Sequence, residues 1–242
     1  MLSLIIPTFN ERDNIQPLLE KLSSVLGRDL YEIIVVDDNS PDQTAQKVRE
    51  FAKQNPRIRL LVRTDRYGLS SAVIDGFKIS QGNILGAMDA DHSHDVSILP
   101  MMVKLIEDGK ADCAVGSRRI PGGGEKDWPW DRRLYSELAT FAARMLAGVS
   151  IKDPMSGYFC VSRTVFERTR NELKPRGYKI LLEILAKAGK ISVAELPYVF
   201  TDRQYGKSKL SAGVATAFGL QLAELWYYRF ESALSRRFPF KS

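Results

Sequence analysis

At 242 residues, the chain is long enough for one large α/β domain, or for one domain with an appendage. Its 44% hydrophobic and 26% charged residues are usual for a soluble globular protein, and no apolar stretch reaches the ~18 residues that a membrane-spanning helix needs. The net charge of +6 is uneven. Residues 1–100 carry 11 Lys and Arg against 14 Asp and Glu, whereas residues 101–242 carry 24 against 15.

The basic second half suits a partner that carries phosphate groups, such as a nucleotide, an anionic membrane or a nucleic acid. Nucleic acid is the weakest of the three, because the basic segments lack interleaved aromatic residues and RNA-binding signatures. The N-terminus runs straight into an apolar segment without a signal peptide, and Cys113 and Cys160 show no metal-ligand spacing. We therefore expect buried free thiols in a reducing compartment and a protein that is not secreted.

The first half alternates short apolar runs with segments of helical spacing. The predicted strands cover residues 2–6, 32–36, 59–63, 84–88 and 112–116, and the predicted helices cover residues 15–26, 44–53, 69–80 and 98–106. Strands that are apolar throughout and alternate with amphipathic helices predict a mostly parallel sheet that helices cover on both faces.

The second half is less regular. It predicts a flexible link at residues 121–124, a helix at 135–147, a turn at 153–159 that leads into a strand, a helix at 178–187 and a strand at 192–200. A basic loop at 203–210 contains one glycine and precedes a last segment of helical spacing. There are no internal repeats and no low-complexity segments.

Polar residues follow three of the predicted strands, at Thr8–Glu11, Asp37–Ser40 and Asp89–Asp91. Ligands of open parallel sheets bind outside the carboxyl ends of the strands, so these clusters should meet at one edge. Each cluster alone could be a solvated turn, but three acidic clusters on one edge favour a binding site. A dinucleotide site is not favoured, because neither G-x-G-x-x-G nor G-x-x-x-x-G-K-[ST] occurs in the chain.

Asp89 and Asp91 stand two residues apart after the strand predicted at 84–88. In extended backbone, side chains at i and i+2 point to the same face, so both carboxylates can hold one cation while Ala90 turns away. Oxygen ligands suit Mg²⁺ or Mn²⁺, which commonly bind through one or two carboxylates and substrate phosphates. His92 and His94 raise a zinc site as an alternative, although a role in the loop itself is favoured.

An ordered set of short motifs resembles the family 2 glycosyltransferases of the GT-A fold, and more closely the dolichol-phosphate (polyprenol-phosphate) mannose synthases. The motifs span residues 2 to about 210 and are Ile6–Glu11, Val35–Asp42, Gly68–Ala72, Met88–Asp91, Gly116–Arg118, Asp153–Tyr158 and Gly206–Leu210. The resemblance implies a GT-A catalytic domain at 1–210, with a nucleotide-sugar half at 1–117 and an acceptor half at 118–210. It also implies inverting, metal-dependent transfer of mannose from GDP-mannose to a dolichyl or polyprenyl phosphate, as in a dolichyl-phosphate β-D-mannosyltransferase.

The resemblance carries over residue by residue. The implied nucleotide-sugar site comprises Pro7, Phe9, Glu11, Val36, Asp38, Asp89, Ala90, Asp91, Arg203 and Lys209. Asp89 and Asp91 would hold Mg²⁺ or Mn²⁺ with Ser93, which stands where some relatives have Gln and whose shorter hydroxyl would need a water in between. Arg118, Arg132 and Ser156 would hold the acceptor phosphate, and the catalytic set is Asp89, Asp91, Arg118 and Arg132. Guanidinium groups suit phosphate oxygens because they bind them bidentately.

A phosphate acceptor would need no general base, because a phosphate monoester is largely dianionic at neutral pH. The lipid acceptor requires a membrane surface. Aromatic, apolar and basic residues at helical spacing predict an amphipathic interface segment at 211–242, although this helix could instead pack on the core. We expect peripheral attachment on the cytoplasmic side, by this chain alone or through a small membrane-protein partner.

Two other functions stay open at this stage. The same fold could transfer glucose from UDP-glucose, or another sugar, to a polyprenyl phosphate. A non-catalytic, membrane-associated scaffold that kept the fold is the alternative from a different class.

Overall fold

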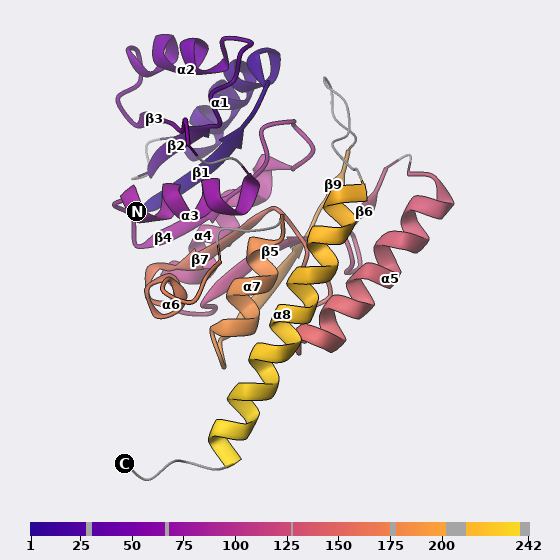
Figure 1. Ribbon diagram of the computed structural model, residues 1–242. Helices are drawn as coiled ribbons and strands as arrows, with labels where there is room; N and C mark the ends of the chain where they lie inside the picture. The colour runs from indigo at the N-terminus through magenta and orange to yellow at the C-terminus, as the bar shows by residue number, and fades with distance from the viewer. Residues whose placement is uncertain (28–30, 66–67, 127, 175–177, 202–211, 238–242) are drawn as a thin grey trace.

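The computed structural model describes residues 1–27, 31–65, 68–126, 128–174, 178–201 and 212–237, and the α8 side chains of residues 216–231. Figure 1 shows a sheet between helices, with two long helices along one flank. The strands are β1 Leu2–Thr8, β2 Tyr31–Asp37, β3 Ile58–Val62, β4 Ile84–Ala87, β5 Cys113–Ser117, β6 Gly124–Glu125, β7 Phe159–Ser162, β8 Val193–Pro197 and β9 Val199–Phe200. The helices are α1 Arg12–Leu26, α2 Thr44–Ala52, α3 Leu69–Ile79, η1 Val96–Ile98, α4 Leu99–Glu107, α5 Trp130–Ala147, α6 Arg163–Thr169, α7 Ile180–Lys187 and α8 Ala212–Arg237.

Seven strands form the main sheet in the order β3-β2-β1-β4-β7-β5-β8, and β6 pairs with β9 in a separate ribbon. All neighbours in the main sheet are parallel except β7, which runs antiparallel to both β4 and β5. Side chains of α1, α2 and α4 cover one face of the sheet, and those of α3, α6 and α7 cover the other. This two-sided cover explains why the central strands are apolar at nearly every position.

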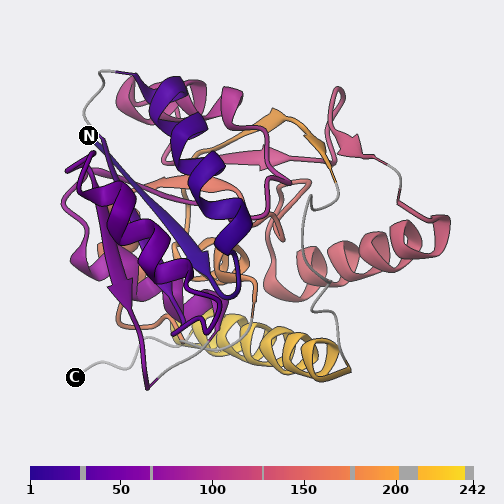
Figure 2. The same cartoon turned by 90° about the horizontal axis from the view of Figure 1, so that it is seen from above.

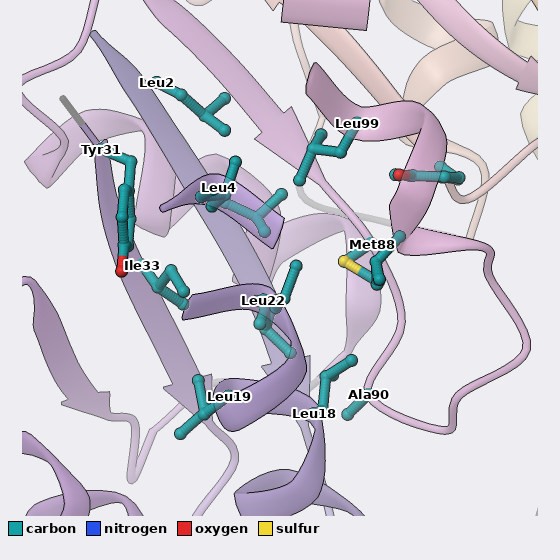
Figure 3. Close-up of a cluster of buried hydrophobic side chains, with 14 of the residues drawn as sticks. Leu2, Leu4, Leu18, Leu19, Leu22, Tyr31, Ile33, Met88, Ala90 and Leu99 are labelled. Atoms are coloured by element: carbon teal, nitrogen blue, oxygen red, sulfur yellow. The ribbon is translucent and has the colours of Figure 1, made fainter. Parts of the chain in front are cut away.

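The larger hydrophobic cluster joins β1 to α1 and to the loop that follows β4. Figure 3 shows Leu4, Leu18 and Leu22 in this cluster together with Met88 and Ala90. Met88 and Ala90 are buried on either side of Asp89. The alternation fixes the direction of the acidic residues, because the apolar neighbours occupy the core and leave the carboxylates on the other side.

The antiparallel strand β7 has a direct consequence for the loops. Its first residue, Phe159, pairs with Ala87 at the end of β4 and with Val115 near the end of β5. The turn before β7 therefore lies at the same edge as the loops that follow β1, β2, β4 and β5. A parallel strand in this position would have sent that turn to the opposite edge.

The predicted strands and helices of the first half are confirmed, with ends that differ by a few residues. In the second half, the predicted flexible link is wrong at Gly124, because Gly124 and Glu125 form β6. The strand predicted at 192–200 is interrupted at Tyr198 and forms β8 and β9. Helix α5 begins at Trp130, five residues before the predicted start, and α6 was not predicted.

Helix α8 packs along α5 and α7, as Figures 1 and 2 show from two directions. Leu222 and Leu225 of α8 are buried in a cluster with Ala143 and Ala147 of α5, and Phe218 lies partly buried against it. These three α8 residues belong to the segment at 211–242 that was predicted to lie at a membrane interface. For them that prediction is wrong, because they pack on the domain, which was the stated alternative.

Candidate functional site at the carboxyl edge of the sheet

The two acidic residues after β2 have different partners. Asp37 is buried and accepts hydrogen bonds from the hydroxyls of Thr8 and Ser40, so it fixes the turn. Asp38 instead forms a buried ion pair with Arg63 and accepts a 2.8 Å bond from the Gly68 amide. The Asp38 carboxylate, predicted to hold the nucleoside, is thus oriented by a side chain and an amide from the segment between β3 and α3.

The other predicted nucleoside residues lie beside Asp38 at the same edge. Pro7 pairs with Val36 across β1 and β2, and Val36 itself is fully buried. Phe9 is 40% exposed at the end of β1. Glu11 accepts a 2.7 Å bond from Asn14 in the first turn of α1. The structure therefore brings these predicted residues together, with the Val36 side chain turned into the core and the Phe9 ring at the surface.

The loop after β4 presents the acidic pair. The Asp89 side chain is 34% exposed, and Asp91 is mostly buried and accepts a 3.1 Å bond from the Ser93 amide. Ser93 Oγ is buried without a hydrogen-bond partner among the described residues. Because the Ala90 methyl group lies in the core, only the backbone of Ala90 could contact a ligand at this edge.

The two histidines after the acidic pair have separate environments. His92 Nε2 lies 2.9 Å from the carbonyl oxygen of Asn14, which ties the loop to α1. His94 is buried, and its burial lowers the pKa of the imidazole although the charges of Asp89 and Asp91 oppose the shift. Among the described residues, no three His, Cys, Asp or Glu side chains gather closely enough to hold a metal ion by themselves. In this structure His92 contacts α1 and His94 is buried beside Asp89.

Arg118 follows β5 and forms a buried pair with Asp153. Its Nε and Nη2 donate to the two carboxylate oxygens at 2.7 and 2.8 Å, and its amide donates to Asp153 Oδ2 at 3.1 Å. Burial alone would raise the pKa of Asp153, but the hydrogen bonds and the charge of Arg118 outweigh it and hold the pKa below its usual value. Arg118, predicted to bind the acceptor phosphate, is therefore already positioned by a carboxylate on one edge of its guanidinium group.

The remaining residues predicted to bind the acceptor, Ser156 and Arg132, have other partners. The Ser156 hydroxyl donates to the Gly116 carbonyl at 2.7 Å and accepts from the Tyr158 amide at 3.1 Å, so it holds the turn before β7. Arg132 stacks on the Trp128 ring at 3.8 Å, and Trp128 contacts Phe200. Ser156 thus has an internal role in this structure. Arg203 and Lys209 lie outside the described residues.

Lys179 is a candidate that the sequence analysis missed. It stands just before α7, and its ammonium donates to the Met155 carbonyl at 3.2 Å. Burial lowers the pKa of Lys179, while the charges of Asp89 and Asp153 act in the opposite direction. A small cavity beside it is lined by Pro7, Asp89, Gly157 and Tyr178. The only signal in the sequence is a single cation before an apolar run, which is too common to be informative.

Comparison with known proteins places the chain in a family. Residues 3–170 match the model of glycosyl transferase family 2. The chain is 42% identical over 210 residues to a dolichol-phosphate mannosyltransferase of Pyrococcus furiosus, with 86% of this chain and 58% of that protein aligned. The chain thus spans less than two thirds of the length of the archaeal relative.

Other relatives align over most of both chains. The chain is 37% identical to the dolichol-phosphate mannosyltransferase of Saccharomyces cerevisiae, with 94% of this chain and 88% of that protein aligned. It is 36% identical to a polyprenol monophosphomannose synthase of Mycolicibacterium smegmatis, with 86% of this chain and 80% of that protein aligned.

Among solved structures, the fold is similar to that of glucosyl-3-phosphoglycerate synthase from Mycobacterium tuberculosis in complex with Mn²⁺, uridine diphosphate and phosphoglyceric acid. The TM-score is 0.66 at 18% identity, and the match covers 95% of this chain and 78% of that chain. This likeness shows the fold alone.

We expect Asp153→Asn to lower the free energy of unfolding at pH 7 by about 3–5 kcal/mol, because it leaves the buried Arg118 charge unpaired. The folded-state pKa of Asp153 lies below the unfolded value of about 4, so its contribution is present above that pH and is lost as the pH falls. Urea denaturation at several pH values should therefore show a shallower acid dependence in the variant.

Asp108→Asn is the control, because Asp108 forms an exposed pair with Lys110 and such pairs contribute at most about 1 kcal/mol. Equal stability losses in the two variants would contradict the assignment of Asp153.

Proposed function

The chain belongs to glycosyl transferase family 2 and is closely related to the dolichol-phosphate and polyprenol-phosphate mannosyltransferases, and from this premise we propose that it transfers a mannosyl group to a polyprenyl or dolichyl phosphate. The observation that carries the proposal is that Asp89 and Asp91 lie at the same edge of the sheet as cations of the second half. Asp89 and Asp91 come from the loop after β4, whereas Arg118 and Lys179 come from segments beyond β5. The two halves can therefore hold two phosphate-bearing substrates at their junction.

The residues present fit a divalent cation of the Mg²⁺ or Mn²⁺ type. Two carboxylates on one loop provide hard oxygen ligands, and the donor's phosphates would complete the coordination. The buried Ser93 Oγ lacks a partner among the described residues, which suits a bond to a water on that cation. When bound, the cation would neutralise charge on the departing diphosphate. Asp89 and Asp91 would be its protein ligands.

The chain's own groups then position the reactants. Arg118 is held by Asp153 on one side, so its orientation is fixed before an acceptor phosphate arrives. The acceptor oxygen attacks the anomeric carbon from the face opposite the diphosphate, the new C–O bond forms as the old one breaks, and the configuration inverts. No proton has to be removed, because the attacking phosphate is already largely dianionic at neutral pH. A protein base is therefore not required.

The donor is proposed to be GDP-mannose, which the resemblance of the motifs implies; the names of the relatives give the mannosyl group and the lipid phosphate but not the nucleotide. The same edge could accept UDP-glucose, because the residues near Asp38 do not distinguish the bases by their chemistry alone. A non-catalytic scaffold is disfavoured, because two buried ion pairs, Arg63 with Asp38 and Arg118 with Asp153, lie at the carboxyl edge, and a scaffold would not need them there.

The membrane contact is proposed to involve α5 as well as α8. The side chains of five apolar α5 residues at spacings of three and four are 46% to 79% exposed, namely Trp130, Leu134, Leu138, Phe141 and Met145. Four α8 residues are also exposed, namely Leu220, Trp226, Tyr227 and Phe230. Exposed apolar and aromatic faces of this length suit a lipid interface. Arg132, Arg133 and Arg144 of α5 would meet anionic headgroups.

Within the described part of the chain, no helix is long and apolar enough to cross a membrane. Attachment through α5 and α8 would therefore be peripheral. The two helices lie side by side, so both exposed faces can contact one surface.

We expect the purified chain with Mg²⁺ or Mn²⁺, a polyprenyl phosphate and GDP-mannose to give a lipid-linked monophosphate sugar, identified by its mass. Asp91→Ala should lower turnover at least ~100-fold by removing a carboxylate that serves the cation. Product formation only with UDP-glucose would correct the donor. Product from no nucleotide sugar would favour the scaffold, and full activity of the variant would contradict the role of Asp91.

A second expectation concerns α5. Replacing both Leu138 and Phe141 by Ser should weaken binding to anionic vesicles about 10-fold, because two exposed apolar groups no longer insert. Co-sedimentation with vesicles of phosphatidylcholine and phosphatidylglycerol measures this. Met101→Ser is the matched control, because Met101 is equally exposed but lies on α4. Unchanged binding of the double variant would rule out α5 as the contact.

A further inference from the structure

His94 is surrounded by aromatic residues and lies next to Asp89. Its ring stacks on Tyr158, with the ring centroids 5.0 Å apart and the planes at 10°. Tyr198 and Phe200 contact the ring edge-on, at 5.7 and 6.1 Å. All three aromatic residues belong to the second half of the chain. His94 thus comes from a loop of the first half, but its aromatic neighbours come from the second half.

Both nitrogens of the His94 ring lie close to atoms of Asp89. The Asp89 amide donates to His94 Nδ1 at 3.3 Å, which places the ring proton of the neutral imidazole on Nε2. Nε2 lies 3.8 Å from Asp89 Oδ2. Nδ1 thus contacts the backbone of Asp89, and the N–H group at Nε2 lies near the Asp89 carboxylate.

Gly157 also lies against the Asp89 carboxylate. A Cβ atom at position 157 would stand 3.2 Å from Asp89 Oδ2 and 3.5 Å from Oδ1. The carboxylate is therefore close both to the His94 ring and to the backbone of the turn before β7. Because about a third of the Asp89 side chain remains exposed, these neighbours restrict its orientation and still leave it accessible to a ligand.

The segment directly after β9 also holds the loop that carries His94. The Thr201 amide, directly after β9, donates to the Ser93 carbonyl at 3.4 Å, and the Thr201 hydroxyl donates to the His92 carbonyl at 3.4 Å. These bonds hold the backbone that carries His94 against the end of β9. The ring is thereby fixed through its backbone as well as through its aromatic neighbours.

We propose that His94 is a positioning residue that fixes Asp89 in the orientation needed to bind the cation of the donor diphosphate. The proposal rests on the function proposed above, because it assigns Asp89 to that cation. His94 itself is not a ligand or a base. Its side chain is only 2% exposed, Nδ1 accepts from the Asp89 amide at 3.3 Å, and Nε2 lies 3.8 Å from the Asp89 carboxylate. Residues that orient metal ligands in this way typically change metal affinity 10- to 100-fold when they are replaced.

Two substitutions separate the polar role from packing. His94→Phe keeps an aromatic ring for Tyr158 to stack on but removes both nitrogens. His94→Asn loses the stack but can return an acceptor close to the Nδ1 position. We expect Mn²⁺ affinity, measured by calorimetry with Mn²⁺ alone and with GDP or UDP, to fall roughly 10- to 100-fold in His94→Phe. The His94→Asn variant should recover part of that loss despite its poorer packing.

Thermal unfolding of each variant provides the control for a general loss of structure. Phe166→Ala removes a fully buried side chain of α6, which follows β7 at the opposite edge of the sheet, so it lowers stability and should leave Mn²⁺ affinity unchanged. In a transfer assay, His94→Phe should need a higher Mn²⁺ concentration for half-maximal rate, and excess Mn²⁺ should restore most of kcat.

Wild-type Mn²⁺ affinity in His94→Phe would overturn the proposal, as would an affinity loss in Phe166→Ala of the same size at equal destabilisation. Absence of Mn²⁺ binding by the wild-type chain under all three conditions would overturn it as well. Mn²⁺ binding that depends on His94, without any sugar transfer, would support the positioning role and contradict only the proposed function.

Discussion

The buried pair between Arg118 and Asp153 is the interaction on which the candidate site depends most. It joins the end of β5 to the turn before β7 through two side-chain bonds and one backbone bond. Breaking such a pair leaves an unpaired charge in a place that water does not reach, which is more costly than the pair's net contribution suggests. The pair therefore keeps the turn at the carboxyl edge, and with it Gly157, which lies against Asp89.

The two halves contribute different chemistry to that edge. Strands β1, β2 and β4 are parallel and bring acidic loops to it, whereas the antiparallel β7 brings a loop of the second half to the same place. The acidic loops of the first half and the cations of the second half therefore meet at this edge, where Arg118 pairs with Asp153 and Lys179 lies near Asp89. On the flank of the second half, α5 and α8 expose apolar faces. A donor in the first half and a lipid acceptor at a membrane would approach the same junction.

The sequence predicted the first half well because its strands are buried on both faces and its helices are regular. It also predicted that Asp89 and Asp91 follow β4 at the carboxyl edge and that Ala90 between them turns into the core. The second half was harder to predict. The direction of β7 depends on pairing with β4 and β5, and the partners of Arg118 and Ser156 lie about 35 to 40 residues away. The roles of Lys179 and His94 come from burial and from neighbours distant in sequence, which local patterns do not encode.

The attack by the acceptor's own phosphate is tested most directly by the pH dependence of kcat/KM. If the dianionic acceptor is the nucleophile, the acid limb follows the second pKa of that acceptor, near ~6 for a phosphate monoester. A polyprenyl phosphonate has a higher second pKa, so the limb should move to higher pH by the difference between the two acceptors. A limb that stays at the same pH with both acceptors would assign it to a base on the protein and contradict this mechanism.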